Sequence, residues 1–160
     1  MKLLTPSLWS PSLLIALGFG TGLSPLAPGT VATAWAWLSF NALQPVMSDW
    51  AWALLLSLGF LIGLWAIGHT TRLLDQQDPS SIVWDEILAF WVVLWILKGS
   101  LVQEALAFVL FRLFDVLKPG PVGWADRRFK GAFGVMFDDL IAAGLSLFCM
   151  ATLLRLLPEP

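Results

Sequence analysis

Five apolar runs follow one another along the chain, separated by short stretches that contain polar residues, proline or glycine. They predict helices over residues 30–47, 51–68, 82–97, 101–117 and 135–157. Each run is near the length of about 20 apolar residues with which a helix crosses a bilayer. The period-2 alternation of a half-buried strand is missing. The pattern therefore predicts an all-α, polytopic transmembrane helical bundle with about four to five spans.

A shorter apolar piece, residues 13–23, precedes these runs and is interrupted by three glycines. It is too short for a full span, and we expect a re-entrant or interfacial segment. Proline and glycine also mark the predicted helix ends. Pro45 closes the first helix, Gly99 and Ser100 form the turn between the third and fourth, and Pro119 stops the fourth.

The composition agrees with a membrane protein. Of the 160 residues, 58% are hydrophobic and 12% are charged, whereas charged residues make up about 25% of soluble domains. A chain of this length with several spans leaves no residues for a second soluble body, so we expect a single domain over residues 1–160. The one cysteine, Cys149, excludes an internal disulfide and lies in an apolar run, where a packing role is expected.

The charges are distributed unevenly between the two ends of the predicted bundle. Short turns make successive helices run up and down, so alternate connections lie on the same side of the membrane. One side then carries six basic residues and the other carries two: Arg72, Arg112, Lys118, Arg127, Arg128 and Lys130 against Lys98 and Arg155. Because cytoplasmic loops are enriched in lysine and arginine, the first side is predicted to be cytoplasmic.

Most of the acids belong to the same side. They are Asp75, Asp78, Asp85, Glu86, Asp115, Asp126, Asp138 and Asp139, while Asp49, Glu104 and Glu159 lie elsewhere. Carboxylates at the ends of apolar helices are costly, and in membrane proteins they usually face the protein interior, paired or bound to cations. Any chemistry is therefore expected at the cytoplasmic face.

Each acidic site also has a simpler structural explanation. Asp85 and Glu86 follow Ser80 and Ser81, either of which can cap a helix whose dipole then favours the acids. Asp115 lies near a helix C-terminus, where the dipole opposes it, so Arg112, Lys118 or a bound cation must compensate its charge. Asp138 and Asp139 are about 100° apart around a helix, so one can face an interhelical cavity and the other a neighbouring helix.

Together the five carboxylates of Asp85, Glu86, Asp115, Asp138 and Asp139 come from three helices at one depth. Such a set of hard oxygen ligands suits Mg²⁺, which keeps several waters and binds substrate phosphate. One histidine and one cysteine exclude a cysteine-rich or histidine-rich zinc site. They also exclude a histidine nucleophile with a separate histidine acid, which leaves a metal-activated water as the predicted nucleophile. His69 can act as an acid or a base, or can simply mark the interface.

Two further segments have the composition of a phosphate site. The segment 18–30, GFGTGLSPLAPGT, can form a phosphate-binding loop in which Thr30 caps a helix beginning at Val31. The alternative is a re-entrant loop that only breaks the helix. The basic group Lys118, Arg127, Arg128 and Lys130 suits anionic oxygens. An ordinary basic loop on anionic lipid is the alternative, and it is the preferred one for Arg128.

Four motifs, in this order and spacing, make the chain resemble the phosphatidylglycerophosphatase A family: GFGTGLSPLAPGT, SSIVWDE, FRLFDVLKPGPVGWADRRFKG and FGVMFDDLIAAG. The similarity covers about residues 18–144. It departs from the family pattern at Gly120 and at residues 130–132, which puts a catalytic role for Lys130 in doubt but does not affect the acids. The family's motif positions correspond here to Ser24, Pro28, Gly29, Thr30, His69, Asp85, Glu86, Arg112, Asp115, Lys118, Pro119, Asp126, Arg127, Gly131, Gly134, Asp138 and Asp139.

The resemblance implies Mg²⁺-dependent hydrolysis of phosphatidylglycerophosphate to phosphatidylglycerol and phosphate, at the bacterial inner membrane. The expected partners are this lipid and the surrounding membrane lipid, with no nucleic acid, and the oligomeric state is left open. The expected catalytic residues are the five acids and His69, and the five acids are also the expected metal ligands. The expected phosphate-binding residues are Ser24, Thr30, Arg112, Lys118 and Arg127.

One alternative from a different class is a small cation or proton transporter, because intramembrane carboxylates also line ion pathways. The acids of this chain cluster at one face, however, and none lies at the middle of a predicted span. A purely structural membrane subunit is the other alternative. It predicts that neutral substitutes of Asp115 have no effect on activity.

Overall fold

A computed structural model describes residues 10–74 and 80–156, and this part of the chain contains helices and no strand. Asp75, Asp78, Glu159 and the end of the fifth predicted helix at residue 157 lie outside the described residues. The elements are α1 (Pro11–Ala16), η2 (Gly18–Leu23), α2 (Pro28–Leu43), α3 (Asp49–Leu74), α4 (Trp84–Leu97), α5 (Leu101–Leu117), α6 (Gly120–Arg128) and α7 (Gly131–Leu156).

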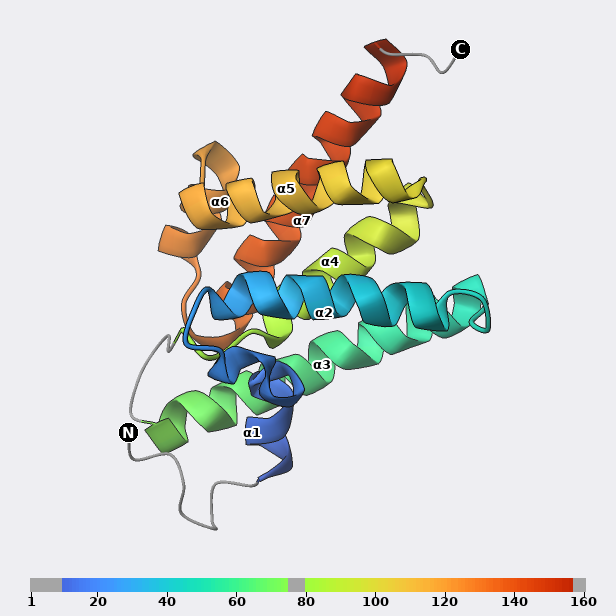
Figure 1. Cartoon of the computed structure of the whole chain (residues 1–160). Helices are drawn as coiled ribbons and strands as arrows, with labels where there is room; N and C mark the ends of the chain where they lie inside the picture. The colour runs from blue at the N-terminus through green and yellow to red at the C-terminus, as the bar shows by residue number, and fades with distance from the viewer. Residues whose placement is uncertain (1–9, 75–79, 157–160) are drawn as a thin grey trace.

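The helix α4 forms the centre of the molecule, with α2, α3, α5 and α7 around it (Figure 1). Its residues Ile87, Phe90, Val93 and Leu94 are all fully buried. A helix that is apolar on every side is stable only when it is covered on every side. The apolar run from residue 82 to 97 is therefore satisfied by neighbouring helices rather than by solvent.

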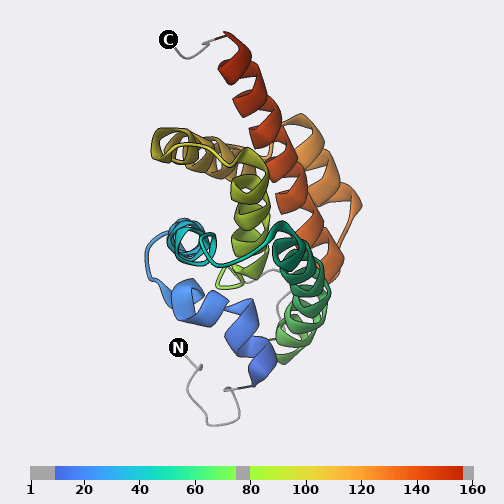
Figure 2. The ribbon, with the colours of Figure 1, turned by 90° about the vertical axis from the view of Figure 1, so that its right-hand side faces the viewer.

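Two of the described helices, α3 and α7, are long and apolar enough to cross a membrane by length and composition. Helices α2, α4 and α5 have 16, 14 and 17 residues and are shorter than α3 and α7, which have 26 each. Figure 2 shows α7 extending beyond the rest of the bundle at its C-terminal end. The structure thus supports membrane association through two helices, and further spans remain a prediction.

The N-terminal apolar piece folds as two short helices, α1 and η2, joined by a kink. Phe19 and Gly20 in η2 have φ angles of 56° and 100°, in the left-handed region that glycine tolerates best. The segment packs against α3 and α2. The backbone N–H of Val83 donates to the carbonyl of Ala16 at 2.9 Å, which ties this segment to the start of α4.

Two predicted helix caps are wrong. Neither Ser80 nor Ser81 caps α4, because α4 begins at Trp84 after Val83, which is already held by Ala16. Thr30 does not cap α2 either, since α2 begins at Pro28 after Ala27, which has a left-handed φ of 45°. Proline is favoured in the first turn of a helix, where its missing N–H costs nothing.

The helix α6 is a further correction, because the sequence predicts a loop between residues 118 and 134. This helix begins at a glycine and a proline and has no long apolar run, so hydrophobic periodicity does not reveal it. It packs on α7 through Val122 and Ala125, which are buried. Tertiary packing, rather than apolar length, accounts for this helix.

Two tryptophans link α4 to its neighbours. Trp84 lies against Gly59 and Gly63 of α3, where a side chain at Gly63 would meet the indole ring. Its indole N–H donates to the carbonyl of Gly59 at 2.9 Å. Trp91 donates to the carbonyl of Ala36 in α2 at 3.0 Å. The buried indole N–H groups of Trp84 and Trp91 thus both have a partner, which offsets the cost of burying them.

Candidate active site

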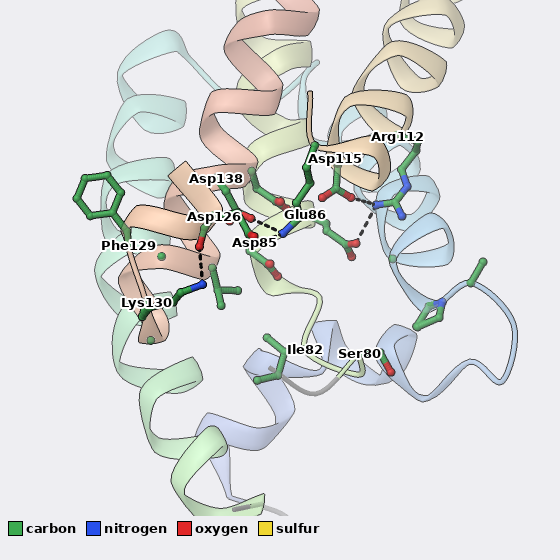
Figure 3. Close-up of a pocket in the computed structure, with 18 residues that line it drawn as sticks. Ser80, Ile82, Asp85, Glu86, Arg112, Asp115, Asp126, Phe129, Lys130 and Asp138 are labelled. Atoms are coloured by element: carbon green, nitrogen blue, oxygen red, sulfur yellow. Dashed lines mark hydrogen bonds and ion pairs between the residues drawn. The ribbon is translucent and has the colours of Figure 1, made fainter. Parts of the chain in front are cut away.

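A polar cavity of about 370 Å³ lies where α2, α4 and α7 begin and where α5 ends, with α6 at its side (Figure 3). Every one of the five acids expected at the site lines this cavity. The charged residues that line it are Asp85, Glu86, Arg112, Asp115, Lys118, Asp126, Lys130, Asp138 and Asp139. The predicted convergence of carboxylates from three separate helices is therefore confirmed.

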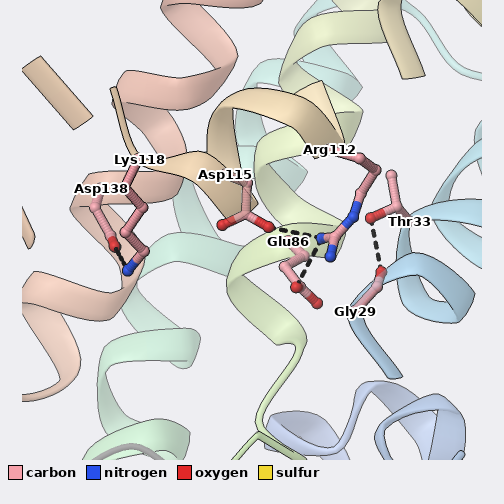
Figure 4. Close-up of polar contacts among 7 residues, drawn as sticks. All are labelled: Gly29, Thr33, Glu86, Arg112, Asp115, Lys118 and Asp138. Carbon is pink, nitrogen blue, oxygen red and sulfur yellow. Dashed lines mark hydrogen bonds and ion pairs between the residues drawn. The ribbon is translucent and has the colours of Figure 1, made fainter. Parts of the chain in front are cut away.

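Arg112 holds two of these acids together. Its Nη1 donates to Glu86 Oε1 at 2.8 Å and to Asp115 Oδ2 at 2.7 Å (Figure 4). The three side chains are between 11% and 15% exposed. Charge-assisted hydrogen bonds are stronger in such surroundings than in water. Arg112 is thus the group that compensates Asp115 at the unfavourable end of α5.

Lys118 joins a second pair of acids on the other side of the cavity. Its Nζ lies 2.6 Å from Asp126 Oδ1 and 2.7 Å from Asp138 Oδ2. Lys118 follows the last residue of α5 in a left-handed conformation, with φ of 46°, which directs the chain into α6. The C-terminus of α5, α6 and α7 therefore meet at one ammonium group.

The environment keeps Lys118 and Asp126 charged. Burial lowers the pKa of Lys118, but the hydrogen bonds that Lys118 donates to Asp126 and Asp138 outweigh it and raise that pKa above its usual value of 10.5. The hydrogen bond from Lys118 is also the main reason why the pKa of Asp126 lies below its usual value of 3.8. Both partners are thus ionised around neutral pH.

Gly29 leaves room for the carboxylate of Glu86. A Cβ at this position in the first turn of α2 would collide with both carboxylate oxygens and the carbon between them. The carbonyl of Gly29 accepts the hydroxyl of Thr33 at 2.8 Å, within the same helix (Figure 4). The start of α2 can therefore approach Glu86 only because residue 29 has no side chain.

Three helix N-termini meet at the cavity and add partial positive charge to a lining rich in carboxylates. The N-terminal turns of α2, α4 and α7 contribute Gly29, Asp85 and Gly131 to its lining. A helix N-terminus carries a partial positive charge and unsatisfied N–H groups, which favour carboxylates and phosphate. The same ends therefore stabilise the acids and make the cavity suitable for an anionic ligand.

Several buried carboxylate oxygens in the cavity have no hydrogen-bond donor. Among the described residues these include Asp85 Oδ1, Asp138 Oδ1 and Asp139 Oδ2. Uncompensated buried oxygens are costly, and oxygen atoms of this kind are the ligands that Mg²⁺ prefers. These carboxylate oxygens thus have the chemistry of ligands for a divalent cation.

The carboxylates have suitable chemistry for a metal ion, but they are not arranged around one point. Within residues 10–74 and 80–156, no three acidic, histidine or cysteine side chains form a group already placed to hold a metal ion. The physical reason lies in the two cations, since Arg112 and Lys118 each take carboxylate oxygens that a metal would otherwise contact. A cation that binds here must compete with them.

Four of the expected site residues lie outside the cavity lining. Ser24 donates its hydroxyl to the carbonyl of Leu26 at 2.8 Å, and Thr30 lies within the first turn of α2. His69 pairs through Nδ1 with Ser12 Oγ at 2.8 Å and stacks on Trp65. Arg127 is exposed on α6. The structure therefore brings together the acids, Arg112 and Lys118, but not these four side chains.

Among the acids that line the cavity, Asp126 is absent from the expected catalytic, metal and phosphate-binding sets. It belongs to α6, the helix that the apolar pattern does not reveal, so its position could not be derived from spacing along a predicted helix. The available signal was its place in the motif FRLFDVLKPGPVGWADRRFKG, eight residues after Lys118.

Comparison with known proteins agrees with the composition of this cavity. The family model described as phosphatidylglycerophosphatase A matches residues 14–154. The chain belongs to this family. It is 38% identical over 138 residues to phosphatidylglycerophosphatase A of Escherichia coli, covering 86% of this chain and 80% of that protein. It is 37% identical over 138 residues to the protein of the same name from Haemophilus influenzae, covering 86% and 85%.

Another relative carries a different name. A putative phosphatidylinositol-3-phosphatase of Bacteroides thetaiotaomicron is 36% identical over 145 residues, covering 86% of this chain and 90% of that protein. No solved structure matches the chain. Membership of the phosphatidylglycerophosphatase A family identifies the chain as a phosphatase, and the transporter alternative finds no support in these relatives.

Proposed function

We propose that the protein hydrolyses phosphatidylglycerophosphate to phosphatidylglycerol and phosphate, in a Mg²⁺-dependent reaction at the cytoplasmic face of the bacterial inner membrane. The observation that carries the proposal is the convergence of six carboxylates with Arg112 and Lys118 in one cavity of about 370 Å³. The names of the E. coli and H. influenzae relatives supply the substrate. The charge asymmetry of the loops supports the cytoplasmic orientation.

In this proposal the two cations bind the phosphate. Arg112 and Lys118 exchange part of their contacts with carboxylates for contacts with the phosphate oxygens. Their charge then stabilises the additional negative charge of the transition state. The N-terminal turns of α2, α4 and α7 contribute their dipoles to the same end. Binding energy is thereby directed to the reacting phosphate group.

The carboxylates Asp85, Glu86, Asp115, Asp138 and Asp139 are the proposed Mg²⁺ ligands, in part directly and in part through water. When bound, the ion neutralises phosphate and lowers the pKa of water. A cavity carboxylate orients the attacking water and takes its proton, the water oxygen bonds to phosphorus, and the bond from phosphorus to the glycerol oxygen breaks. That oxygen takes up a proton, which gives the phosphatidylglycerol hydroxyl.

The proposed membrane arrangement has α2, α4 and α5 within the bilayer beside α3 and α7, with α1 and η2 at the interface. The cavity then lies at the depth of the lipid head groups, and a lipid enters it sideways while its acyl chains remain at the depth of the bilayer. This position explains why acids at the ends of apolar helices are retained.

The test is phosphate release from phosphatidylglycerophosphate by the purified protein in detergent. Release is expected with Mg²⁺, is lost with a chelator and returns when Mg²⁺ is added in excess. Asp138→Asn should abolish release in a protein that keeps its thermal unfolding temperature. Asp49→Asn, which changes an exposed acid outside the cavity, should be normal. Turnover in the chelator, or in Asp138→Asn, would reject the mechanism. Faster release from phosphatidylinositol-3-phosphate would reject the assigned substrate.

A further inference from the structure

A second hollow, of about 300 Å³, lies between α3, α4 and α7. We call it the apolar groove, and its lining consists of Ala53, Leu56, Ser57, Phe60, Leu88, Val92, Trp95 and Leu140. The two polar side chains in this lining are bonded to the protein. Ser57 donates its hydroxyl to the carbonyl of Ala53 at 2.7 Å, and Trp95 donates its indole N–H to Asp49 Oδ1 at 3.2 Å. The groove therefore suits an apolar ligand.

The groove exists because α3 and α7 diverge from the cavity end of the bundle, which leaves one face of α4 between them (Figures 1 and 2). These walls are the two helices that are long and apolar enough to cross a membrane. In the proposed membrane arrangement, the groove therefore lies at the depth of the lipid hydrocarbon.

The groove and the polar cavity share one face of α4. Asp85 lines the cavity, whereas Leu88 and Val92 line the groove. Spacings of three and seven residues place side chains on the same side of a helix. The two hollows thus follow one another along the same side of α4.

The length of the groove also agrees with this ligand. At a rise of about 1.5 Å per residue, the seven steps along α4 from Leu88 to Trp95 span about 10 Å, which is enough for part of an acyl chain. At the far end, Asp49 accepts from Trp95 and pairs with Lys98 at 2.8 Å, which places polar groups beyond the apolar lining. Along α4, the groove thus follows the polar cavity and ends at charged groups near the other end of the helix.

We propose that the apolar groove binds one acyl chain of the substrate lipid while the phosphate of the same molecule lies in the polar cavity. The inference rests on the proposed function, since it takes a phosphorylated glycerolipid as the substrate. Its occupant is a substrate acyl chain rather than a bulk lipid, because the groove continues from the cavity along the same face of α4. Binding of the chain fixes the position of the head group relative to Arg112 and Lys118.

The test fills the groove with a larger side chain. Val92→Trp occupies the groove, and Val109→Trp makes the same change at a position of α5 that is 60% exposed and outside it. Phosphate release is measured for dipalmitoyl and dihexanoyl phosphatidylglycerophosphate at equal mole fractions in one detergent. We expect Val92→Trp to raise KM for the dipalmitoyl lipid about fivefold, or about 1 kcal/mol, relative to the dihexanoyl lipid. The effect is modest because the chain leaves detergent or lipid rather than water. Val109→Trp should leave the ratio unchanged.

A labelling experiment separates failure of the groove from failure of the proposed function. A phosphatidylglycerophosphate with a diazirine in one acyl chain is irradiated on the wild-type protein in chelator. The label is expected on peptides of α3 and α4 that contain groove residues, and it should be lost in Val92→Trp. If Val92→Trp does not fold, Ser57→Trp at the rim of the groove replaces it.

The outcomes are distinct. Equal changes of KM for both lipids would reject the proposal that the apolar groove binds an acyl chain. Labelling of α5 at Val109 as strong as that of the groove peptides would also reject it. A dimer in the wild type that becomes a monomer in Val92→Trp, with KM unaltered, would instead assign the groove to a second copy of the chain. Absence of wild-type phosphate release would reject the proposed function alone, since the labelling pattern does not depend on turnover.

Discussion

The carboxylate of Glu86 on α4 occupies the space in which a side chain at Gly29 on α2 would lie. Two segments that are far apart in the sequence are therefore in direct backbone to side-chain contact at the cavity. Glu86 is in turn bonded to Arg112, so the position of the α2 N-terminus affects the placement of a cation proposed to bind phosphate.

Replacement of this glycine should disturb catalysis more than folding. We expect Gly29→Ala to lower kcat on the order of a hundredfold, because displacement of catalytic groups by about 1 Å has effects of this size. The control is Gly144→Ala on α7, where a Cβ meets no atom within 4 Å. That variant should keep full activity and gain up to about 1 kcal/mol from helix propensity. Normal kcat in Gly29→Ala would show that the contact does not position Glu86.

The pairs made by Arg112 should contribute to stability as well as to binding. Arg112→Gln leaves Glu86 and Asp115 without their shared cation, so we expect the free energy of unfolding to fall by about 3 kcal/mol. Adding Asp115→Asn to Arg112→Gln should restore part of the lost stability, because the double variant no longer has two unpaired carboxylates, Glu86 and Asp115, that repel each other. Lys98→Gln, which breaks a pair that is 51% and 63% exposed and screened by solvent, should have little effect on stability. Equal losses in Arg112→Gln and Lys98→Gln would contradict the expectation.

The pair of Lys118 and Asp126 should be insensitive to pH around neutrality. The lowered pKa of Asp126 means that its contribution to stability is present above the usual value of 3.8 and is lost as the pH falls through its folded value. The raised pKa of Lys118 means that its contribution is present below 10.5 and is lost only as the pH rises through its folded value. The difference in unfolding temperature between wild type and Asp126→Asn should therefore stay constant between about pH 5 and 9. It should shrink in more acidic solution, and a change across neutral pH would be the contrary result.

Labelling of single cysteines can test which side of the membrane the cavity faces. In a Cys149→Ser background, we expect Lys130→Cys to react with a membrane-impermeant maleimide only after the cytoplasmic side is opened. Ser100→Cys, in the turn between α4 and α5, should react in intact spheroplasts. Both positions are exposed. The reverse pattern would show that the cavity faces the periplasm, against the expectation from the basic loops.

The apolar pattern predicted the helices well where length and capping agree. The helix over residues 101–117 has the predicted bounds, since Ser100 and Gln103 form a capping box at one end and Pro119 follows the other. The predictions failed where long-range contacts decide the ends. The start of α4 is fixed by the bond from Val83 to Ala16, and α6 depends on its packing against α7.

The site was predicted in part for a similar reason. The cost of carboxylates at the ends of apolar helices was sufficient to indicate that the acids of α4, α5 and α7 face one cavity. The spacing along the chain did not indicate how cations are shared, so the role of Lys118 between Asp126 and Asp138 became visible only with α6 in place. The sequence also placed His69 at this end of the molecule. Its side chain pairs with Ser12 instead and does not line the cavity.

The packing of Trp84 against Gly59 and Gly63 fixes the position of α3 relative to α4 at the cavity end. The halves of these helices that lead away from it are joined near their far ends by the pair of Lys98 with Asp49, which lies outside the cavity lining. Residues gained or lost there would change the apolar height of the protein without moving the carboxylates. The fold can thereby adjust to bilayers of different thickness while its chemistry stays at a constant depth.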